Sequence, residues 1–500
     1  MNTMTIVLLI IFVFTFIPLL LAEFSRGNAI PDLEDFLLQG RQMPLFLVFF
    51  TVYATWVSSF AFMGATASLY SNGPLYMTCF AWNALFAVLY MTLGKRIWYV
   101  GKQRSYFTPT DFYNDIFHSE TLNLLISIIL TVFTLPYLMI QLYAGAYIIE
   151  TVSDGIIPWK AAGLIFYLVI IIYLWAGGIR ALALTDVFYG LLTFVTMLAA
   201  GFIMIRKTGG VEATFAQITE NNFNDLILGS GFTENSPWAW LCMFIIVPLG
   251  ALMGPPMWIR AYVVKEERTF GIMPLLLVSA TIMYLGPLMI SAAAKVLYPN
   301  LEQTDNLILF VLVDSVPIIT STVLMCGVAA AALSTANSQI HALAGLYTVD
   351  IHRRYIRQDS SGWRLVTINK RAIVILSAFA YVLTLNNPGV IIDMGILGMG
   401  GTAQIFVPTL GALFWERSNG TAMIAGLASG IGLLCFLCFI LDLFIPYAAV
   451  FSLLLNAVVF IGLSILLPSD SRARASIVAH RDNFNRRHIQ RERKITNGKN

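Results

Sequence analysis

The sequence predicts an all-α protein that crosses a membrane many times, and three observations support this. Of the 500 residues, 58% are hydrophobic and 11% are charged, whereas charged residues make up about a quarter of an ordinary soluble domain. Apolar runs of roughly 20 residues, the length that spans a bilayer, recur from end to end. Two of these runs are interrupted near their middle by helix-breaking residues. We therefore expect one polytopic membrane domain with about thirteen helices.

The expected spans follow one another with short loops between them. They cover residues 4–22, 44–71, 74–98, 121–150, 160–176, 183–205, 238–258, 270–296, 317–347, 370–386, 389–415, 420–441 and 446–467. The first run has no charged segment before it and no small-residue cleavage site after Leu21, which favours a retained helix over a signal peptide. All five cysteines lie in apolar runs. Cys435 and Cys438 have no turn or histidine beside them, so we assign them to packing.

Lysine and arginine are distributed unevenly between the two sides that thirteen spans define. One side carries most of the basic loops and the tail from Arg472 to Lys499, whereas the other carries only Lys160, Arg206, Lys207 and Lys295. The positive-inside rule then places the C-terminus in the cytoplasm and the N-terminus outside. We expect the tail to anchor the protein rather than bind lipid or nucleic acid, and we expect no nucleic-acid partner. A chain of this kind suits the inner membrane of a bacterium.

Two long spans contain residues that favour an unwound backbone. Span 44–71 has Tyr53-Ala54-Thr55-Trp56-Val57-Ser58-Ser59 at its middle, where small and hydroxyl residues allow carbonyls to face a cavity. Span 238–258 contains Pro248-Leu249-Gly250 and Gly254-Pro255-Pro256, and proline removes a backbone donor and kinks the helix. An ordinary packing kink is the alternative for either helix alone.

The two interruptions occupy the same place in two blocks of five spans, 44–205 and 238–415. Matching breaks in two halves are typical of a repeat-built transporter with its site at the midplane. Around these blocks we expect an extra helix and loop at 1–43, two extra helices at 416–467, and a basic tail at 468–500.

Polar oxygen atoms occur inside two further apolar runs. Asp186 stands near the start of span 183–205, and an ionisable group near hydrocarbon marks an ion or proton path by default. The stretch Ala331-Ala332-Leu333-Ser334-Thr335-Ala336-Asn337-Ser338 places hydroxyl groups inside span 317–347. A hard cation such as sodium prefers oxygen ligands. These features indicate an ion-coupled transporter rather than a membrane enzyme, because the five histidines are isolated and an enzyme needs clustered reactive groups.

These motifs resemble the sodium:solute symporter family along almost the whole chain. Residues 35–41 are similar to its first cytoplasmic loop, 177–186 to the start of its fifth helix, 254–260 to the end of its sixth, and 331–338 with Asp350-Ile351 to its eighth core helix. The resemblance implies a leucine-transporter-like core of two inverted five-helix repeats, with one extra helix before it and two after it.

The resemblance also implies ligands for sodium as the coupling ion. The conserved sodium site of the family matches the carbonyls of Ala54, Val57 and Ala331 and the hydroxyls of Ser334 and Thr335. The alternative for the two hydroxyls is a hydrogen bond to their own helix.

Some members hold a second sodium, and its ligands match Asp186, Ser334, Asn337 and Ser338. Asn337 replaces a serine of the family there, and Tyr189 stands where many members carry glutamine. The alternative for Asp186 is a structural pairing with Arg180.

The sequence constrains the solute less than the ion. The implied fold lines the pocket with the unwound segments and the third and tenth core helices. The candidate side chains are Trp56, Ser58, Ser59, Phe60, Tyr137, Gln141, Thr402 and Gln404. For Gln141 and Gln404 the alternative is an interhelical hydrogen bond.

Around residues 58–70 and 141–150 the chain resembles members that move pantothenate or monocarboxylates. We therefore expect alternating-access symport of sodium with a small carboxylate, whose charge sodium would neutralise and which the free amides of the broken helices would hold. The alternatives are a neutral solute or amino acid, proton coupling, and a membrane sensor that no longer transports.

Overall fold

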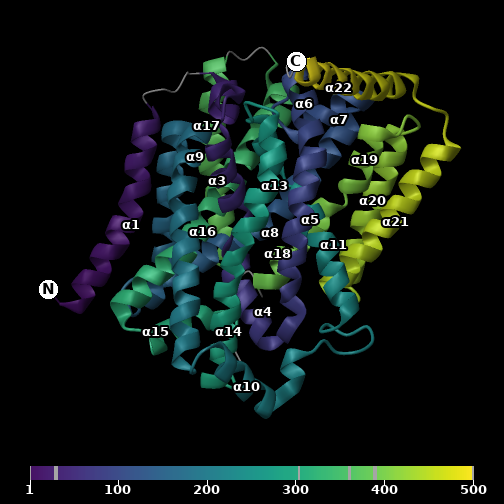
Figure 1. Cartoon of the computed structure of the whole chain (residues 1–500). Helices are drawn as coiled ribbons and strands as arrows, with labels where there is room; N and C mark the ends of the chain where they lie inside the picture. Colours follow the sequence, from purple (N-terminus) through teal and green to yellow (C-terminus); the bar gives the residue numbers. More distant parts are fainter. Residues whose placement is uncertain (1, 27–31, 302–303, 359–361, 387–390, 498–500) are drawn as a thin grey trace.

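The computed structural model describes residues 2–26, 32–301, 304–358, 362–386 and 391–497. These residues form a bundle of helices (Figure 1), and the one β-bridge among them joins Met43 to Val264. The α-helices are α1 (Thr3–Arg26), α2 (Leu33–Leu38), α3 (Leu45–Trp56), α4 (Ala65–Ser71), α5 (Thr78–Leu89), α6 (Lys95–Arg104), α7 (Pro109–Phe117), α8 (Glu120–Val152), α9 (Trp159–Lys207), α10 (Val211–Asn222), α11 (Pro237–Met253), α12 (Pro255–Tyr262), α13 (Arg268–Ala280), α14 (Leu285–Leu297), α15 (Leu307–Ser315), α16 (Ile318–Leu346), α17 (Gly362–Thr384), α18 (Ile391–Ala403), α19 (Phe406–Phe414), α20 (Gly420–Phe439), α21 (Ile445–Leu466) and α22 (Ser471–Asn497).

Shorter helical segments join several of these helices. Three are π-helical, namely η2 (Phe60–Gly64), η4 (Tyr90–Gly94) and η7 (Tyr347–Ile356), and four are 3-10 turns, namely η1 (Gln39–Arg41), η3 (Gly73–Met77), η5 (Phe223–Leu226) and η6 (Thr281–Tyr284). Segment η2 follows the non-helical residues after α3 and continues into α4. Segment η7 extends α16 toward the charged end of the bundle.

Helix α9 is 49 residues long, and its chain direction reverses at Gly178, where φ is 54° and ψ is −137°. Its two halves meet α16 at the same level, because Phe166 and Ala329 line one small cavity while the Thr193 hydroxyl donates to the Gly327 carbonyl at 2.9 Å. The halves therefore run antiparallel. A positive φ of this kind favours glycine, which has no Cβ to clash.

The spans agree with the expectation from the sequence. Ten helices among the described residues are long and apolar enough to cross a membrane, and two further spans are bent helix pairs. With α9 counted as two spans because it reverses, the described residues provide thirteen. Residues 389 and 390, expected at the start of one span, lie outside the described residues.

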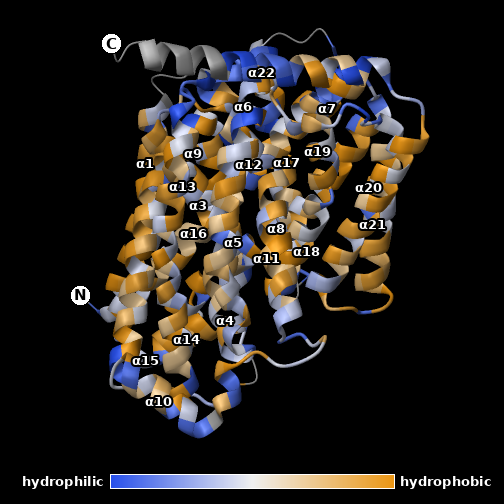
Figure 2. Cartoon of the chain, turned by 45° about the vertical axis from the view of Figure 1, so that its right-hand side comes forward, coloured by the Kyte–Doolittle hydropathy of each residue, from blue (hydrophilic) through white to orange (hydrophobic). Residues whose placement is uncertain are grey.

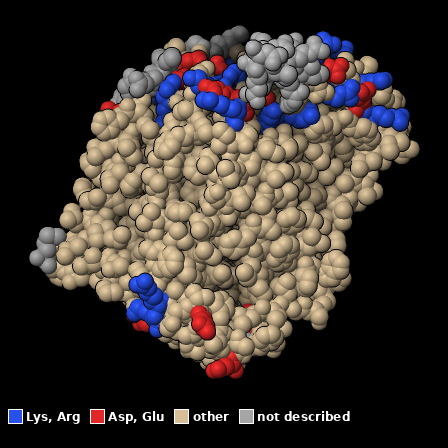
Figure 3. Space-filling view, in the orientation of Figure 1, with Lys and Arg blue, Asp and Glu red and all other residues tan. Residues whose placement is uncertain are grey.

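The surface of the bundle shows how it lies in a bilayer. Hydrophobic residues cover its sides (Figure 2), while Lys, Arg, Asp and Glu form a dense band at one end and only a few charges lie at the other (Figure 3). Helix α1 rises from the lower half of the bundle to the charged end, where α22 lies across the top (Figure 1).

Helix α22 is attached to this charged end by buried apolar groups and by ion pairs. Its Ala473 and Ile477 are buried. Ion pairs join Arg481 to Glu416 at 2.8 Å and Arg487 to Glu267 at 3.8 Å, and a ring nitrogen of His480 lies 3.3 Å from a carboxylate oxygen of Asp115. The helix thereby joins α7, the segment after α19 and the segment before α13.

Candidate functional site

Two helices are broken at the middle of the bundle, at the positions that the sequence predicts. The α3 half and the η2–α4 half are bent by 56°, and α11 and α12 are bent by 57°. In the first break the Ser58 hydroxyl accepts a hydrogen bond from the Phe60 amide at 3.2 Å and so caps the next segment. In the second, Pro255 occupies the first turn of α12, where its fixed φ suits a helix start.

Side chains of α8 hold the first break in place. The hydroxyls of Ser58 and Tyr137 lie 2.7 Å apart, and the amide and hydroxyl of Ser59 donate to Gln141 Oε1 at 3.0 and 2.8 Å. All four residues are buried. Gln141 thus makes the interhelical hydrogen bond that was the alternative to solute binding.

Gln404 is likewise bonded to a neighbouring helix. Its Nε2 donates to the carbonyl of Ala449 in α21 at 3.3 Å, and Asn456 donates to its backbone carbonyl at 2.6 Å. Phe60 packs its ring against Tyr76, Trp82 and Tyr137. These contacts fix η2 against η3, α5 and α8, and they fix the segment after α18 against α21.

Helix α16 brings hydroxyl groups to the carbonyl end of α3. Thr335 Oγ1 donates to the carbonyl oxygens of Ala54 and Thr55, at 3.4 and 3.2 Å. The last carbonyls of a helix have no amide partner within it, so these oxygens are free to bind a donor or a cation. Val57 adopts an extended conformation just after the helix, and Ala331 lies one turn before Thr335 on α16. Of the residues that match the conserved sodium site, the structure thus brings Thr335 into contact with Ala54.

Ser334 points to a different partner than Thr335. Its hydroxyl donates to Asp186 Oδ1 at 2.5 Å, and the Thr51 hydroxyl donates to Asp186 Oδ2 at 2.6 Å. Asp186 is fully buried, and so is Arg260, whose Nη2 lies 3.9 Å from Asp186 Oδ2. The same Nη2 donates to the Ser338 hydroxyl at 2.5 Å. Arg260 is therefore the positive charge that offsets Asp186 inside the membrane domain.

This pairing corrects one alternative from the sequence and adds one residue to the site. Arg180 does not pair with Asp186, because its guanidinium binds Asp35, with Nε donating at 3.1 Å. From the sequence, Arg260 was expected at the end of a motif and among the basic residues of the cytoplasmic side, but it is fully buried beside Asp186. An available signal was its position between Ile259 and Ala261, in an otherwise apolar stretch.

The residues that match a second sodium site surround this ion pair. Ser334 contacts Asp186 directly, and Arg260 lies between Asp186 and Ser338 and contacts both. Asn337 is buried with neither its amide nitrogen nor its amide oxygen hydrogen-bonded. The departure from serine at this position thus places an unpartnered amide in the core.

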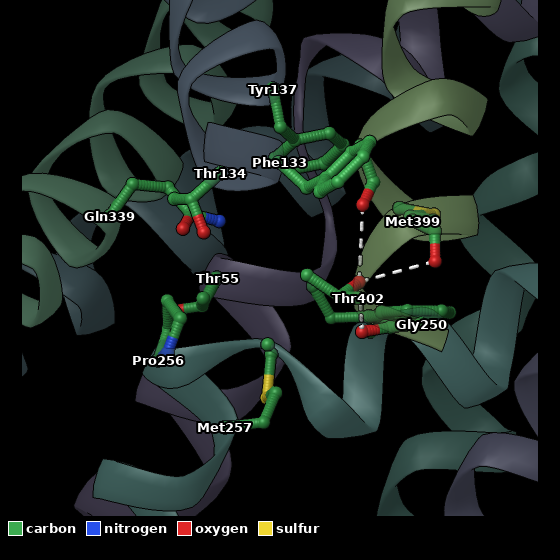
Figure 4. A pocket seen from close by; sticks show the side chains of 14 residues that line it. Thr55, Phe133, Thr134, Tyr137, Gly250, Pro256, Met257, Gln339, Met399 and Thr402 are labelled. Atoms are coloured by element: carbon green, nitrogen blue, oxygen red, sulfur yellow. Dashed lines mark hydrogen bonds between the residues drawn. The ribbon is translucent and has the colours of Figure 1, made fainter. Parts of the chain in front are cut away.

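A small cavity of about 40 Å³ lies between the two breaks (Figure 4). Its lining residues are Thr55, Trp56, Phe133, Thr134, Tyr137, Gly250, Ala251, Gly254, Pro256, Met257, Gln339, Gly398, Met399 and Thr402. Three predicted solute-binding residues, Trp56, Tyr137 and Thr402, are among them, whereas Ser58, Ser59, Phe60, Gln141 and Gln404 are not. The space suffices for a water or an ion, so an organic solute requires the surrounding helices to separate.

The polar groups of this cavity face one another across it. Gln339 and Thr134 lie together on one side and Thr402 on the other (Figure 4). The Thr402 hydroxyl donates to the Gly250 carbonyl at 2.9 Å, whereas Gln339 Oε1 is buried without a partner. None of the described residues that line the cavity is charged. Sequence reasoning missed Gln339 and Thr134, because it followed the hydroxyl pattern of α16 only as far as Ser338.

Two helices that break at mid-bundle and face a small polar cavity define a secondary transporter of the broken-helix kind. The comparisons with known proteins then specify the family. A model of the sodium:solute symporter family matches residues 36–430, and this chain belongs to that family. It is a multi-pass membrane protein and a sodium-coupled solute symporter, not an enzyme.

Relatives with different solutes resemble the chain to a similar degree. It is 25% identical over 412 residues to a sodium/pantothenate symporter of Haemophilus influenzae, which covers 80% of this chain and 83% of that one. It is 24% identical over 433 residues to the osmoregulated proline transporter OpuE of Bacillus subtilis, covering 83% of this chain and 85% of that one.

A solved structure confirms the fold. The substrate-bound, outward-open structure of a Na+-coupled sialic acid symporter superposes with a TM-score of 0.79 at 17% identity, covering 93% of this chain and 99% of that one. The chain therefore has the leucine-transporter-like architecture, with a core of two five-helix repeats.

Proposed function

We propose that this protein moves a small carboxylate solute together with sodium by alternating access, with Ala54, Val57, Ala331, Ser334 and Thr335 as the sodium ligands. The observation that carries the proposal is the contact of Thr335 with the free carbonyl end of α3. Sodium placed there would replace one hydrogen bond by several oxygen ligands, the kind it prefers. It would thereby hold the α3 break against α16.

This position couples the ion to the solute. The α3 break also supplies Thr55 and Trp56 to the central cavity, so ordering the break with sodium forms part of the solute pocket. Each ligand then raises the affinity of the other by the same factor. Each sodium that enters adds about 2.3 kcal/mol per 100 mV of inside-negative potential, which drives uphill accumulation.

The proposal includes a second sodium among Asp186, Ser334, Asn337 and Ser338 only in a conformation that differs from this one. Arg260 Nη2 already contacts Ser338 and faces Asp186. Because both cations would use the same oxygen atoms, a second sodium requires Arg260 to withdraw from Ser338. One sodium per cycle needs no such movement.

The carboxylate assignment has support from chemistry shared by the named relatives, because pantothenate and proline both contain a carboxylate. The amides of the α3 break do not supply donors in this conformation, since Ser59 N binds Gln141. The donors that face the cavity are Thr134 and Gln339, because the Thr55 hydroxyl is paired with the Ser338 hydroxyl at 2.8 Å. Sodium would contribute the positive charge that the lining lacks. The uncharged lining also favours a second candidate, a neutral or zwitterionic solute.

The proposed location is the plasma membrane, with the charged end of the bundle in the cytoplasm. The positive-inside rule supports this direction, because the band of Lys and Arg lies at the end that carries α22 (Figure 3). The beginning of α1 would then lie toward the outside.

Uptake into proteoliposomes tests the proposal. Radiolabelled acetate, pyruvate, lactate, pantothenate, proline and galactose are offered with and without an inward sodium gradient, to the wild type and to a Ser334→Ala/Thr335→Ala variant. A matched control is Thr322→Ala, which removes a hydroxyl of α16 that bonds only its own helix, to Ile318 at 2.7 Å.

We expect sodium-dependent uptake of a carboxylate that the double variant loses and the control retains. Sodium-dependent uptake of proline or galactose alone would refute the carboxylate class and favour the neutral or zwitterionic candidate, but it would not refute the ion. Uptake that ignores both the gradient and the double variant would refute the sodium site, and proton coupling through Asp186 would take its place.

A further inference from the structure

A second cavity, of about 420 Å³, lies at the end of the bundle opposite α22. It is bounded by α4, the start of α18, and the turn between α20 and α21. On α18, Ile396 and Leu397 line this cavity, while the next residues, Gly398 and Met399, line the central one. The two cavities therefore follow one another along α18, and we call the larger one the outer vestibule.

The charged groups of the outer vestibule are all acidic. They are Glu234, Asp305, Asp393 and Asp442, and the described residues of its lining include no Lys, Arg or His. Within the described parts of the chain, no ion pair offsets any of these four carboxylates. They come from four segments far apart in the sequence, so the fold concentrates negative charge here that the sequence disperses.

A buried hydroxyl gives a second and independent indication of a ligand. Ser68 on α4 lines the vestibule and is 3% exposed, and its oxygen has no hydrogen-bond partner. A buried polar atom without a partner costs free energy unless a ligand or water satisfies it. Hydroxyl and carboxylate oxygens favour hard cations, and no three acidic side chains of the described residues lie close enough to hold a metal ion, so the vestibule can attract cations without chelating one.

We propose that the outer vestibule is a recruitment site for monovalent cations, which gathers them above the deeper sodium site. Carboxylates of one sign on low-dielectric walls focus the electric field and raise the local concentration of counter-ions. The assignment of this end to the outside, and of sodium as the ion that profits, rests on the proposed function. The cation preference itself depends only on the four carboxylates and the cavity.

A native cysteine reports the potential inside the vestibule. Cys438 lines it, and Cys79, Cys242 and Cys326 are buried elsewhere, so a Cys435→Ala background leaves one half-exposed thiol. The measurement is the ratio of its reaction rates with a cationic and an anionic methanethiosulfonate. The ratio cancels any change in the thiolate fraction, because both reagents attack the same thiolate.

The acid-neutralised variant replaces the four carboxylates with Glu234→Gln, Asp305→Asn, Asp393→Asn and Asp442→Asn. We expect the cation-to-anion ratio to fall about tenfold at low ionic strength, and the difference to vanish near 1 M salt, where the Debye length is about 3 Å. The matched control is Glu212→Gln/Glu220→Gln, which removes two exposed carboxylates of α10 at the same end. If Cys438 does not react, Ser71→Cys places the reporter on another wall of the vestibule.

The outcomes separate this proposal from the proposed function. Equal ratios in the parent and the acid-neutralised variant would overturn the vestibule site, as would an equal fall in the α10 control. Binding of radioactive sodium to the purified protein is measured in parallel with the rate ratio. We expect a several-fold weaker apparent affinity for sodium in the acid-neutralised variant, at low salt only. A tenfold ratio change without any sodium binding would uphold the vestibule as a cation site and refute the proposed deeper sodium site.

Discussion

Replacing Asp186 with asparagine tests the electrostatics at the centre of the molecule. Arg260 Nη2 lies 3.9 Å from Asp186 Oδ2, and both side chains are fully buried. At an effective dielectric constant of about 20, an attraction over this distance is about 4 kcal/mol, and loss of one member of a buried pair costs about 3–5 kcal/mol. Asparagine keeps the shape and can still bond Ser334 and Thr51, so the change isolates the charge.

The assay is thermal unfolding in detergent, followed with a thiol-reactive dye that reports exposure of the buried Cys79, Cys242 and Cys326. Unfolding entropy scales at about 2.1 cal/mol/K per residue, so in a chain of this length 1 kcal/mol corresponds to roughly 1 °C. We expect Asp186→Asn to lower Tm by about 3–5 °C. Asp225→Asn, which breaks the half-exposed pair with Lys295 at 2.9 Å, is the control and should shift Tm by about 1 °C or less.

A double variant, Asp186→Asn/Arg260→Gln, completes the cycle and should recover part of the loss, because it no longer buries an unpaired charge. A wild-type Tm for Asp186→Asn would show that the pair does not stabilise the fold. Additive losses in the double variant would show that the two residues act independently.

Three further predictions follow from contacts in the core. Thr335→Val keeps the volume but removes the hydroxyl at the α3 carbonyls, so the sodium-induced rise in Tm should require at least about tenfold more sodium; an unchanged sodium dependence would contradict the ligand assignment. Gly250→Ala would place a Cβ 2.0 Å from the Met399 carbonyl oxygen and should destabilise the folded protein by about 1–3 kcal/mol. In the control Gly432→Ala the new Cβ has no atom within 4 Å, so Tm should stay unchanged or rise slightly. Equal Tm values for both variants would refute the close packing of α11 on α18. Gln339→Ala removes an amide whose oxygen has no hydrogen-bond partner in the central cavity. It should raise the KM for the transported solute without changing the affinity for sodium. If the affinities for solute and sodium both fall, Gln339 supports the fold instead.

The spans and both breaks are predictable from the sequence because they depend on local composition. Apolar length determines what crosses the membrane, and Gly254-Pro255-Pro256 cannot continue a helix without a kink. The turn at Gly178 is sharper than the loop expected between residues 176 and 183, because a single glycine with positive φ suffices for the reversal. The direction of the chain in the membrane and the repeat boundaries stay predictions.

The side-chain pairings of the site are less predictable, because they join residues far apart in the chain. Resemblance to a family brings Thr335 and Ala54 together, but it does not say that Ser58 bonds Tyr137 or that Ser59 bonds Gln141. Those bonds depend on which way each helix face turns after packing.

Helix α22 lies on the surface at a place from which movements of the charged end of the bundle can be measured. Helix α22 contacts α7, Glu416 and Glu267. If these parts of the bundle move apart, the helix must therefore move with one of them or lose its ion pairs to the others. A donor dye on α22 and an acceptor at the beginning of α13 would convert that movement into a change of energy-transfer efficiency. The opening and closing of single transporters could then be timed with no label in the core.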